Sequence, residues 1–404
     1  MEHTLPMSLR QLNKLDILRR VERHEITAVQ AASLLHLNER SVRRRVERLV
    51  TEGPSSLQHG LKGRPSNNAL PGEETHRIEQ LLRTKYPDFG PTFAAEKLVE
   101  IHGIDRDPKT VRNIQIRLGL WKPRSARTKV EHRFYRERRG SFGEMQQFDG
   151  SYHNWFEGRN GIQEACLLLS VDDATGHVTL AQFAEHEGVL PVMGFWLDYA
   201  HIQGIPKAIY LDRFSTYSMN VKLAAENPDT LTQFERAAKE AGVEVIHAMS
   251  PQAKGRVERV FETWQDRLVK ELRLHGISTI EEANAFLTNV FVPAFNEKFG
   301  KNPKQTGNLH RKPSERELAD ILPYIFCRRE KRVIQHDFTV AYKTKWFQLL
   351  PTPRLAMRPK ERAYVHEFPD GDIHLLVRGK QTNFHPLPKR PRQTQTKQRA
   401  QTLA

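Results

Sequence analysis

Three acidic residues stand where the chain could bring carboxylates together around metal ions. Asp149 and Asp212 each end a predicted strand, and Glu258 lies inside a predicted long helix that Ser250 opens. Three carboxylates held at one place repel one another unless divalent cations lie between them. Oxygen ligands of this kind select Mg²⁺ or Mn²⁺. Two such ions can activate an attacking water or hydroxyl and stabilise the leaving oxygen of a phosphodiester.

Strands and helices in a particular order would position these acids. The strands are expected at residues 144–149, 165–171, 179–183, 207–211 and 243–248, and the helices at residues 190–201, 231–241 and from 250 onward. Three strands followed by alternating helices and strands is the order of an RNase H-like α/β/α fold. Its first and fourth strands are neighbours, so Asp149 would lie beside Asp212, with Glu258 lowered onto them from the last helix.

Asp172 and Asp173 compete with Asp149 for the place of the first acid. They begin the run Asp172-Asp173-Ala174-Thr175-Gly176, whose composition predicts a turn between the second and third strands. Taken singly, Asp149 is also compatible with a strand-end turn residue and Asp212 with an ordinary surface aspartate. The spacing of the acids together with the residues before Glu258 favours the triad.

Residues 9–50 predict three helices. Thr27 and Gln30 form a capping box that opens the second helix, and Asn38 is expected to cap the third. The pattern is typical of a helix-turn-helix, and a plain helical bundle is the alternative. The third helix would expose arginines that suit phosphates and guanine edges in a major groove. They are Arg40, Arg43, Arg44, Arg45 and Arg48.

A linker rich in Gly, Pro, Ser and Asn follows the first three helices. Its segment Lys62-Gly63-Arg64-Pro65 is similar to the core of an AT-hook, in which the arginine reaches the floor of a minor groove. An ordinary turn is the alternative reading of this tetrapeptide. We therefore expect Lys62 and Arg64 to contact DNA.

A second unit of three helices is predicted next. Thr92 is expected to open its second helix, and Asp107, followed by Pro108, caps a third helix that ends at Gly119. Lys109 and Arg112 on this third helix are expected to contact DNA. Tandem helix-turn-helix units would read a longer DNA site than one unit can.

The C-terminal part predicts a small β-barrel. Short alternating runs indicate five strands, at residues 332–336, 338–342, 346–350, 363–368 and 373–378. Asp370-Gly371 is a hairpin turn, and five short strands this close together suit an SH3-like barrel. The tail is polar and basic, which favours disorder.

Composition excludes several classes of protein. The chain has 404 residues, a net charge of +15 and only two cysteines, which excludes a disulfide scaffold and a cysteine-rich zinc site. No apolar run approaches the length of a membrane-spanning helix, and the first residues, which lack a basic region followed by an apolar one, do not indicate secretion. Residues 1–148 carry 28 basic and 18 acidic side chains (+10), residues 149–300 carry 13 and 21 (−8), and residues 301–404 carry 22 and 9 (+13). Basic flanks around an acidic middle favour phosphate-binding arms on either side of a domain with another use for its carboxylates, although solvated faces are the commoner reason for charge runs.

The segment Ser250-Pro251-Gln252-Ala253-Lys254-Gly255-Arg256-Val257-Glu258-Arg259 carries a resemblance to a known family. It matches the Pro-x-x-x-Gly-x-x-Glu signature of DDE transposases and retroviral integrases, and the whole chain resembles the integrase-core transposases of bacterial insertion sequences. The resemblance implies that Asp149, Asp212 and Glu258 are the catalytic, metal-binding triad. Lys254 and Arg259 would contact DNA beside it.

Two features depart from the best-known members of this family. The gap between Asp212 and Glu258 is 45 residues, longer than in those members, and we expect the extra residues around positions 215–230. The His-His-Cys-Cys zinc domain of retroviral integrases is absent, since Cys166 and Cys327 lie 161 positions apart.

The resemblance also implies an activity and partners. We expect a Mg²⁺-dependent DNA transposase with two ions, replaceable by Mn²⁺, that cuts element ends and joins them to target DNA. Its partners would be the terminal inverted repeats, target DNA and further copies of the chain in a synaptic complex, with no membrane. The location would be the bacterial cytoplasm, at the nucleoid when DNA is bound. The alternative is a non-catalytic DNA-binding regulator derived from a transposase.

The predicted domain organisation is a multidomain α/β chain. The expected segments are a helix-turn-helix (1–52), a linker (53–72), a second helix-turn-helix (73–121), a basic linker (122–142), an RNase H-like integrase core (143–300), a connector (301–328), a small β-barrel (329–386) and a basic disordered tail (387–404).

Overall fold

The computed structural model describes residues 7–58, 70–123, 137–211, 227–247, 255–350 and 355–388. The chain divides into two compact units, Met1–Pro123 and Arg124–Ala404. No helix in the described ranges is long and apolar enough to cross a membrane.

The first unit begins with three helices around a small apolar core. They are α1 (Leu9–Glu22), α2 (Ala28–Leu35) and α3 (Glu39–Glu52), followed by the 3₁₀ turn η1 (Gly53–Leu57). The predicted caps are confirmed: Thr27 and Gln30 form the capping box of α2, and the Asn38 side chain accepts the Ser41 N–H at the start of α3. Leu18 and Val42 are fully buried between these helices.

Three more helices complete the first unit. They are α4 (Gly72–Thr84), α5 (Pro91–His102) and α6 (Pro108–Arg117). Asp107 caps α6 as predicted, its carboxylate accepting the Lys109 N–H at 2.7 Å. The prediction that Thr92 opens α5 is wrong by one residue, because Gly90 is the N-cap and Pro91 the first helical residue.

The second unit is built on a five-stranded mixed sheet. Its strands are β1 (Met145–His153), β2 (Ala165–Asp172), β3 (Val178–Ala184), β4 (Ala208–Leu211) and β5 (Glu244–His247), in the order β3-β2-β1-β4-β5. β1, β2 and β3 are antiparallel, whereas β4 pairs in parallel with both β1 and β5. The predicted neighbourhood of the first and fourth strands is therefore confirmed.

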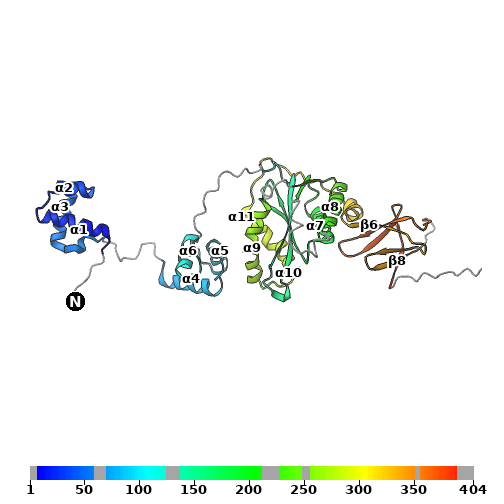
Figure 1. Cartoon of the computed structure of the whole chain (residues 1–404), viewed down its shortest axis with the longest axis horizontal. Coiled ribbons are helices and arrows are strands. Elements are labelled where there is room, and N and C mark those ends of the chain that lie inside the picture. Colours follow the sequence, from blue (N-terminus) through cyan, green and yellow to red (C-terminus); the bar gives the residue numbers. More distant parts are fainter. Residues whose placement is uncertain are drawn as a thin grey trace, which may run out of the picture. The chain divides into compact units, whose positions relative to one another are not determined.

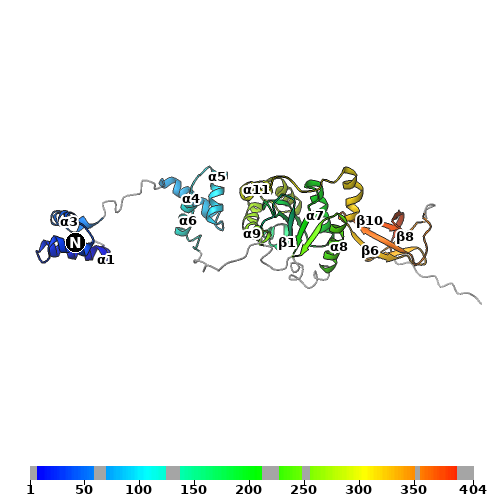
Figure 2. The ribbon, with the colours of Figure 1, turned by 90° about the horizontal axis from the view of Figure 1, so that it is seen from above.

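Helices cover both faces of this sheet, as Figures 1 and 2 show. One face carries α7 (Val189–Ile202) and α8 (Asn227–Glu240); the other carries α9 (Val257–Leu274), α10 (Ile280–Phe286) and α11 (Val292–Phe299), the last two joined by the π-helical turn η4 (Leu287–Phe291). Each face has its own apolar core. Trp196 lies in the first core and Trp264 in the second, and both are buried.

Two predicted boundaries that concern the acids are wrong. β1 continues past Asp149 to His153 because it stays paired with β2 along its whole length, so Asp149 lies inside the strand and not at its end. In the described residues α9 begins at Val257, after a turn at Gly255 and Arg256, whereas the helix was predicted to open at Ser250. Ser250 itself lies outside the described residues.

The C-terminal strands form two antiparallel sheets over one apolar core. One sheet has the order β11-β10-β9-β6, with β6 (Arg328–Val333), β9 (Arg362–Glu367), β10 (Ile373–Val377) and β11 (Lys380–Thr382); the other has β12-β8-β7, with β7 (Thr339–Tyr342), β8 (Lys345–Leu349) and β12 (Phe384–Leu387). The prediction of five strands is wrong, since short strands at 380–382 and 384–387 add to them and the first strand begins at Arg328. No ladder among the described residues joins the two sheets, so the SH3-like barrel stays a prediction.

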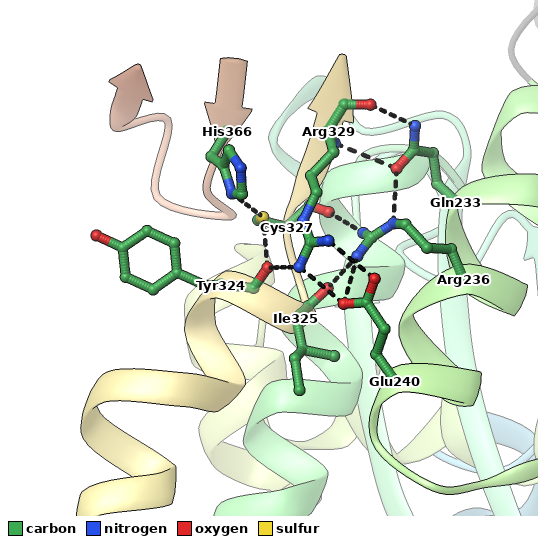
Figure 3. A network of polar contacts seen from close by, with 8 residues as sticks. All are labelled: Gln233, Arg236, Glu240, Tyr324, Ile325, Cys327, Arg329 and His366. Atoms are coloured by element: carbon green, nitrogen blue, oxygen red, sulfur yellow. Dashed lines mark hydrogen bonds and ion pairs between the residues drawn. The ribbon is translucent and has the colours of Figure 1, made fainter. Parts of the chain in front are cut away.

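A polar network ties β6 to helix α8 of the core (Figure 3). Arg329 forms a bidentate ion pair with Glu240, at 2.7 and 2.8 Å. Arg236 donates to the carbonyls of Ile325 and Cys327. Ile325 is the last residue of the short helix α12 (Leu322–Ile325), and Cys327 follows that helix. These bonds pair buried backbone groups at the junction, so the C-terminal sheets are attached to α8 by specific contacts.

Candidate active site

Asp149 lies on the face of β1 that α9 covers. Side chains alternate along a strand, and Phe148 packs in the core on the α7 side. The neighbours of Asp149 on its own face both bond to α9: the Gln147 Oε1 accepts the Val257 N–H at 3.3 Å, and the Ser151 Oγ accepts from Gln265 Nε2 at 3.2 Å. Asp149 is half-buried between these two attachments.

Glu258 is the second residue of α9, and its side chain is exposed. Its position follows from that of Val257, whose backbone N–H is bonded to β1 through Gln147. A carboxylate in the first turn of a helix is favoured by the partial positive charge of the helix N-terminus. The first turn of α9 therefore presents Glu258 beside the strand that carries Asp149.

Asp212 lies outside the described residues, as does Lys254. Leu211, the residue before Asp212, is the last residue of β4. β4 pairs with β1 up to the partners Gln147 and Tyr210. No group of three His, Cys, Asp or Glu side chains suited to a metal ion is found among the residues that the structure describes.

Asp172 and Asp173 have structural partners in the turn between β2 and β3, where a turn was predicted. The Asp172 carboxylate accepts from the Gly143 and Thr175 backbone N–H groups, the Thr175 hydroxyl and the Gln146 amide, at 2.8–3.1 Å. Asp173 accepts from Gln147 and Arg256. Both aspartates are fully buried. This arrangement favours Asp149 over either of them as the first acid.

The other face of β1 brings a further acid close to the strand. A Cβ at Gly150 would lie 2.8 Å from the Oε2 of Glu187, so only glycine allows this approach. Burial raises the pKa of the neighbouring Cys166 thiol, and the negative charges of Glu187 and Asp149 raise it further. Glu187 therefore lies against β1 on the face opposite to Asp149.

The donor set at this site fits hard divalent cations. Asp149 and Glu258 offer carboxylate oxygens, the ligands that Mg²⁺ and Mn²⁺ prefer. Both cysteines are buried elsewhere, Cys166 on the α7 side and Cys327 at the junction with β6. Neither thiol competes for a cation beside α9.

The predicted DNA-contacting residues of the first unit are mostly exposed. Arg40, Arg43, Arg44 and Arg48 are exposed on α3, and Lys109 and Arg112 are exposed on α6. Arg45 is an exception: its side chain is half-buried, and its charge lowers the pKa of Lys14 on α1, after the larger effect of burial. The prediction that Arg45 is exposed is therefore wrong, because α1 packs against that side of α3.

Two of these arginines already have acidic partners on their own helix. Arg43 pairs with Glu39, and Arg48 pairs with Glu52 at 2.9 Å. Arg259 is exposed on α9 and donates to the Gly255 carbonyl. Lys62 and Arg64 lie outside the described residues.

Sequence reasoning missed the residues that join β1, the turn after β2 and the start of α9. Gln147, Asp173 and Arg256 form contacts between segments up to 110 residues apart in the chain. Arg256 lies inside the signature segment Ser250–Arg259, and this position is the only feature of the sequence that could have marked it. Gln147 and Asp173 have no local pattern that marks them, because their role depends on which segments meet in the fold.

The mixed sheet of order β3-β2-β1-β4-β5 with helices on both faces is the RNase H-like arrangement that the sequence predicts. A helix-turn-helix domain family matches residues 13–66. The chain is 35% identical over 387 residues to the putative transposase y4bF of Sinorhizobium fredii, covering 96% of this chain and 82% of that protein. It is 28% identical over 410 residues to the transposase for insertion sequence IS1202 of Streptococcus pneumoniae, covering 92% and 85%. The chain belongs to this family of insertion-sequence transposases.

Solved structures give weaker matches. A chain of the simian T-cell lymphotropic virus intasome, in complex with a PP2A regulatory subunit, matches over 77% of this chain and 100% of that chain at 14% identity, with a TM-score of 0.33. The HTLV-2 integrase catalytic core with magnesium, in its dimeric form, matches over 38% and 90% at 16% identity, with a TM-score of 0.26. The fold assignment here therefore rests on the strand ladders of the chain itself.

Proposed function

We propose that this protein is a DDE-type DNA transposase, which cuts DNA at the ends of its element and joins them to target DNA. The observation that carries the proposal is the attachment of α9 to β1. Gln147 bonds the first residue of α9, so Glu258 is held beside the strand that carries Asp149. Family membership supports the same conclusion.

The third acid of the proposed triad is Asp212. β1 and β4 are parallel and pair at Gln147 and Tyr210, and two further residues along each chain reach Asp149 and Asp212. β4 ends at Leu211, and Asp212 is the next residue in the sequence. The register of the two strands thus supports the pairing of these acids.

We infer that Asp149, Asp212 and Glu258 would hold two Mg²⁺ ions, for which Mn²⁺ would substitute. Bound there, the ions would supply an activated water or 3′-hydroxyl and stabilise the charge on the leaving oxygen. The acids themselves orient the reacting phosphate and form no covalent bond to DNA. Catalysis would then come from positioning and electrostatic stabilisation.

The helical units would bind the terminal inverted repeats. Arg40 and Arg44 form no ion pair within the described residues, so their charges are available for DNA. Further contacts are proposed for Arg43, Arg45, Arg48, Lys62, Arg64, Lys109, Arg112, Lys254 and Arg259. Because two element ends must be cut and joined together, we infer a dimer or larger assembly on DNA.

A strand-transfer assay tests the proposed function. The purified protein is incubated with labelled element-end DNA and a target plasmid, with Mg²⁺, with Mn²⁺ or with EDTA. We expect nicking at the element ends and joined products with either metal and none with EDTA. Binding of end DNA without any nicking or joining, with both metals and over a range of salt, would instead identify a non-catalytic regulator.

A further inference from the structure

We propose that Arg256, Asp173 and Gln147 form a positioning network that fixes the first turn of α9 against β1. The inference rests on the proposed function, in which Glu258 on that turn is a metal ligand. None of the three residues is proposed to touch DNA or metal. Their role would be to set the place of Glu258 relative to Asp149.

The centre of the network is a buried carboxylate. Asp173 is fully buried. Its Oδ1 accepts from the Gln147 amide at 2.7 Å and from the Arg256 guanidinium at 2.5 Å, and its Oδ2 accepts the Arg139 backbone N–H at 2.8 Å. The Arg256 side chain is only 12% exposed. A buried ion pair of this kind is strongly dependent on both partners, because loss of one leaves the other charge uncompensated.

Gln147 carries the attachment from Asp173 to the helix. Its Nε2 donates to Asp173 while its Oε1 accepts the Val257 N–H at 3.3 Å. The first N–H groups of a helix need acceptors from outside the helix, and the N-cap residue of α9, Arg256, provides no side-chain cap. A side chain of β1 therefore caps α9, from a strand 110 residues earlier in the chain.

This arrangement joins the two elements that carry acids. Gln147 is two residues before Asp149 on the same face of β1, and Val257 is adjacent to Glu258. Arg256 and Val257 are consecutive, so the ion pair and the cap act on the same turn. A change in either contact would move Glu258 with respect to Asp149, and residues that orient metal ligands typically change metal affinity or activity by about 10–100-fold.

The test needs a matched arginine that is only structural. Arg159 lies at the opposite end of α9, where it pairs with Glu157 at 2.7 Å and donates to the Ile277 carbonyl at 3.0 Å. Its side chain is 22% exposed. Arg159→Gln therefore removes an ion pair and a backbone contact of a partly buried arginine on the same face of the sheet, away from the acids.

The experiment measures Mn²⁺ binding to the full chain without DNA, from the electron paramagnetic resonance signal of free Mn²⁺. We expect Arg256→Gln and Asp173→Asn to weaken Mn²⁺ binding by about tenfold, and Arg256→Lys to restore most of it. Arg159→Gln should melt at a lower temperature than wild type but bind Mn²⁺ as wild type does. Glu258→Gln is measured beside them as the direct loss of a ligand.

The outcomes separate the inference from the proposed function. Wild-type Mn²⁺ affinity in Arg256→Gln, with weakened binding in Glu258→Gln, overturns the positioning role only. Wild-type Mn²⁺ affinity in Glu258→Gln overturns the proposed metal site itself. If Arg256→Gln does not fold, Gln147→Met is used instead. It removes the cap of α9, and the buried charge of Asp173 stays paired with Arg256. Unchanged Mn²⁺ affinity in that variant also overturns the inference.

Discussion

The Asn296 side chain on α11 pairs both backbone polar groups of Val178 on β3. Its Oδ1 accepts the Val178 N–H and its Nδ2 donates to the Val178 carbonyl, each at 2.8 Å. Asn284 on α10 pairs the Phe183 N–H and carbonyl in the same way, at 2.6 and 3.1 Å. Since β3 is the last strand on its side of the sheet, two amide side chains occupy an edge that could otherwise pair with another chain.

Asn296→Leu should therefore destabilise the second unit. The substitution leaves the buried N–H and carbonyl of Val178 without their partner, which costs about 2–4 kcal/mol for the two groups together. The measurement is urea unfolding of the full chain followed by circular dichroism. Glu297→Leu, at the next and exposed position, should change stability by less than about 0.5 kcal/mol. Equal effects of the two substitutions would contradict the role of Asn296.

Substitution of the proposed acids should remove chemistry and keep DNA binding. Asp149→Asn and Glu258→Gln are each expected to lower nicking of element-end DNA by at least about 100-fold, since loss of a ligand empties a metal position. The matched control is Glu262→Gln, because Glu262 is exposed one turn further along α9. Nicking at more than a few per cent of wild type by Asp149→Asn or Glu258→Gln would remove that residue from the triad.

The first unit should bind the element end by itself. Residues 1–123 carry 21 basic and 15 acidic side chains, a net charge of +6, and form a compact unit. We expect a fragment of these residues to bind end DNA in a gel shift, with affinity that falls steeply as salt rises. Absence of selective binding by the fragment would contradict the modular assignment.

Within that fragment, substitution of Arg44 tests whether α3 is the recognition helix, because Arg44 is exposed on that helix. Arg44→Ala should weaken binding to the element end by about 1–3 kcal/mol if the side chain reads a base, and should lower the ratio of specific to non-specific affinity. Arg23→Ala is the control, since Arg23 is also exposed but follows α1. A similar loss in both variants would indicate that α3 is not the recognition helix.

Stability of the second unit should fall at mildly acidic pH because of His366. Burial, and after it the nearby charges of Arg329, Arg236 and His374, together lower the pKa of His366 to about 4. The unfolded chain, in which a histidine titrates near 6.5, then binds the proton that the folded state excludes. The stabilising effect is complete above pH 6.5 and is lost as pH falls towards 4, by up to about 1.4 kcal/mol per pH unit.

Urea unfolding at pH 7.5, 6 and 5 checks this prediction. His366→Gln should reduce the loss of stability between pH 7.5 and 5, although part remains because burial also lowers the pKa of His310. His385→Gln, at an exposed position on β12, should leave the pH dependence as in wild type. An unchanged pH dependence in His366→Gln would contradict the assignment.

Local sequence determined the helices of the first unit. Helix caps could be predicted because each capping side chain bonds to a backbone N–H no more than three residues away. They are the capping box of Thr27 and Gln30 and the N-caps Asn38 and Asp107. The same holds for the turn at Asp172–Gly176. The order of strands in the core was also predictable, since burial of both sheet faces gives short apolar runs in a characteristic succession.

Only the tertiary structure decided where the acids stand. Asp149 was expected at a strand end, but pairing with β2 extends β1 to His153. The described start of α9 is at Val257, where Gln147 caps it from another strand. Arg45 is half-buried because α1 packs against α3. Neither the sequence around Asp149 nor that around Arg45 contains the partner that sets its environment.

The physical reason is the range of the deciding contacts. A helix cap or a tight turn is a contact between residues a few positions apart, so both partners of the contact can be recognised in one short stretch of sequence. The bonds of Asp173 to Arg256 and of Asn296 to Val178 join segments 83 and 118 residues apart. Their residues form no periodic or local pattern, and their partners become neighbours only when the sheet and its covering helices pack together.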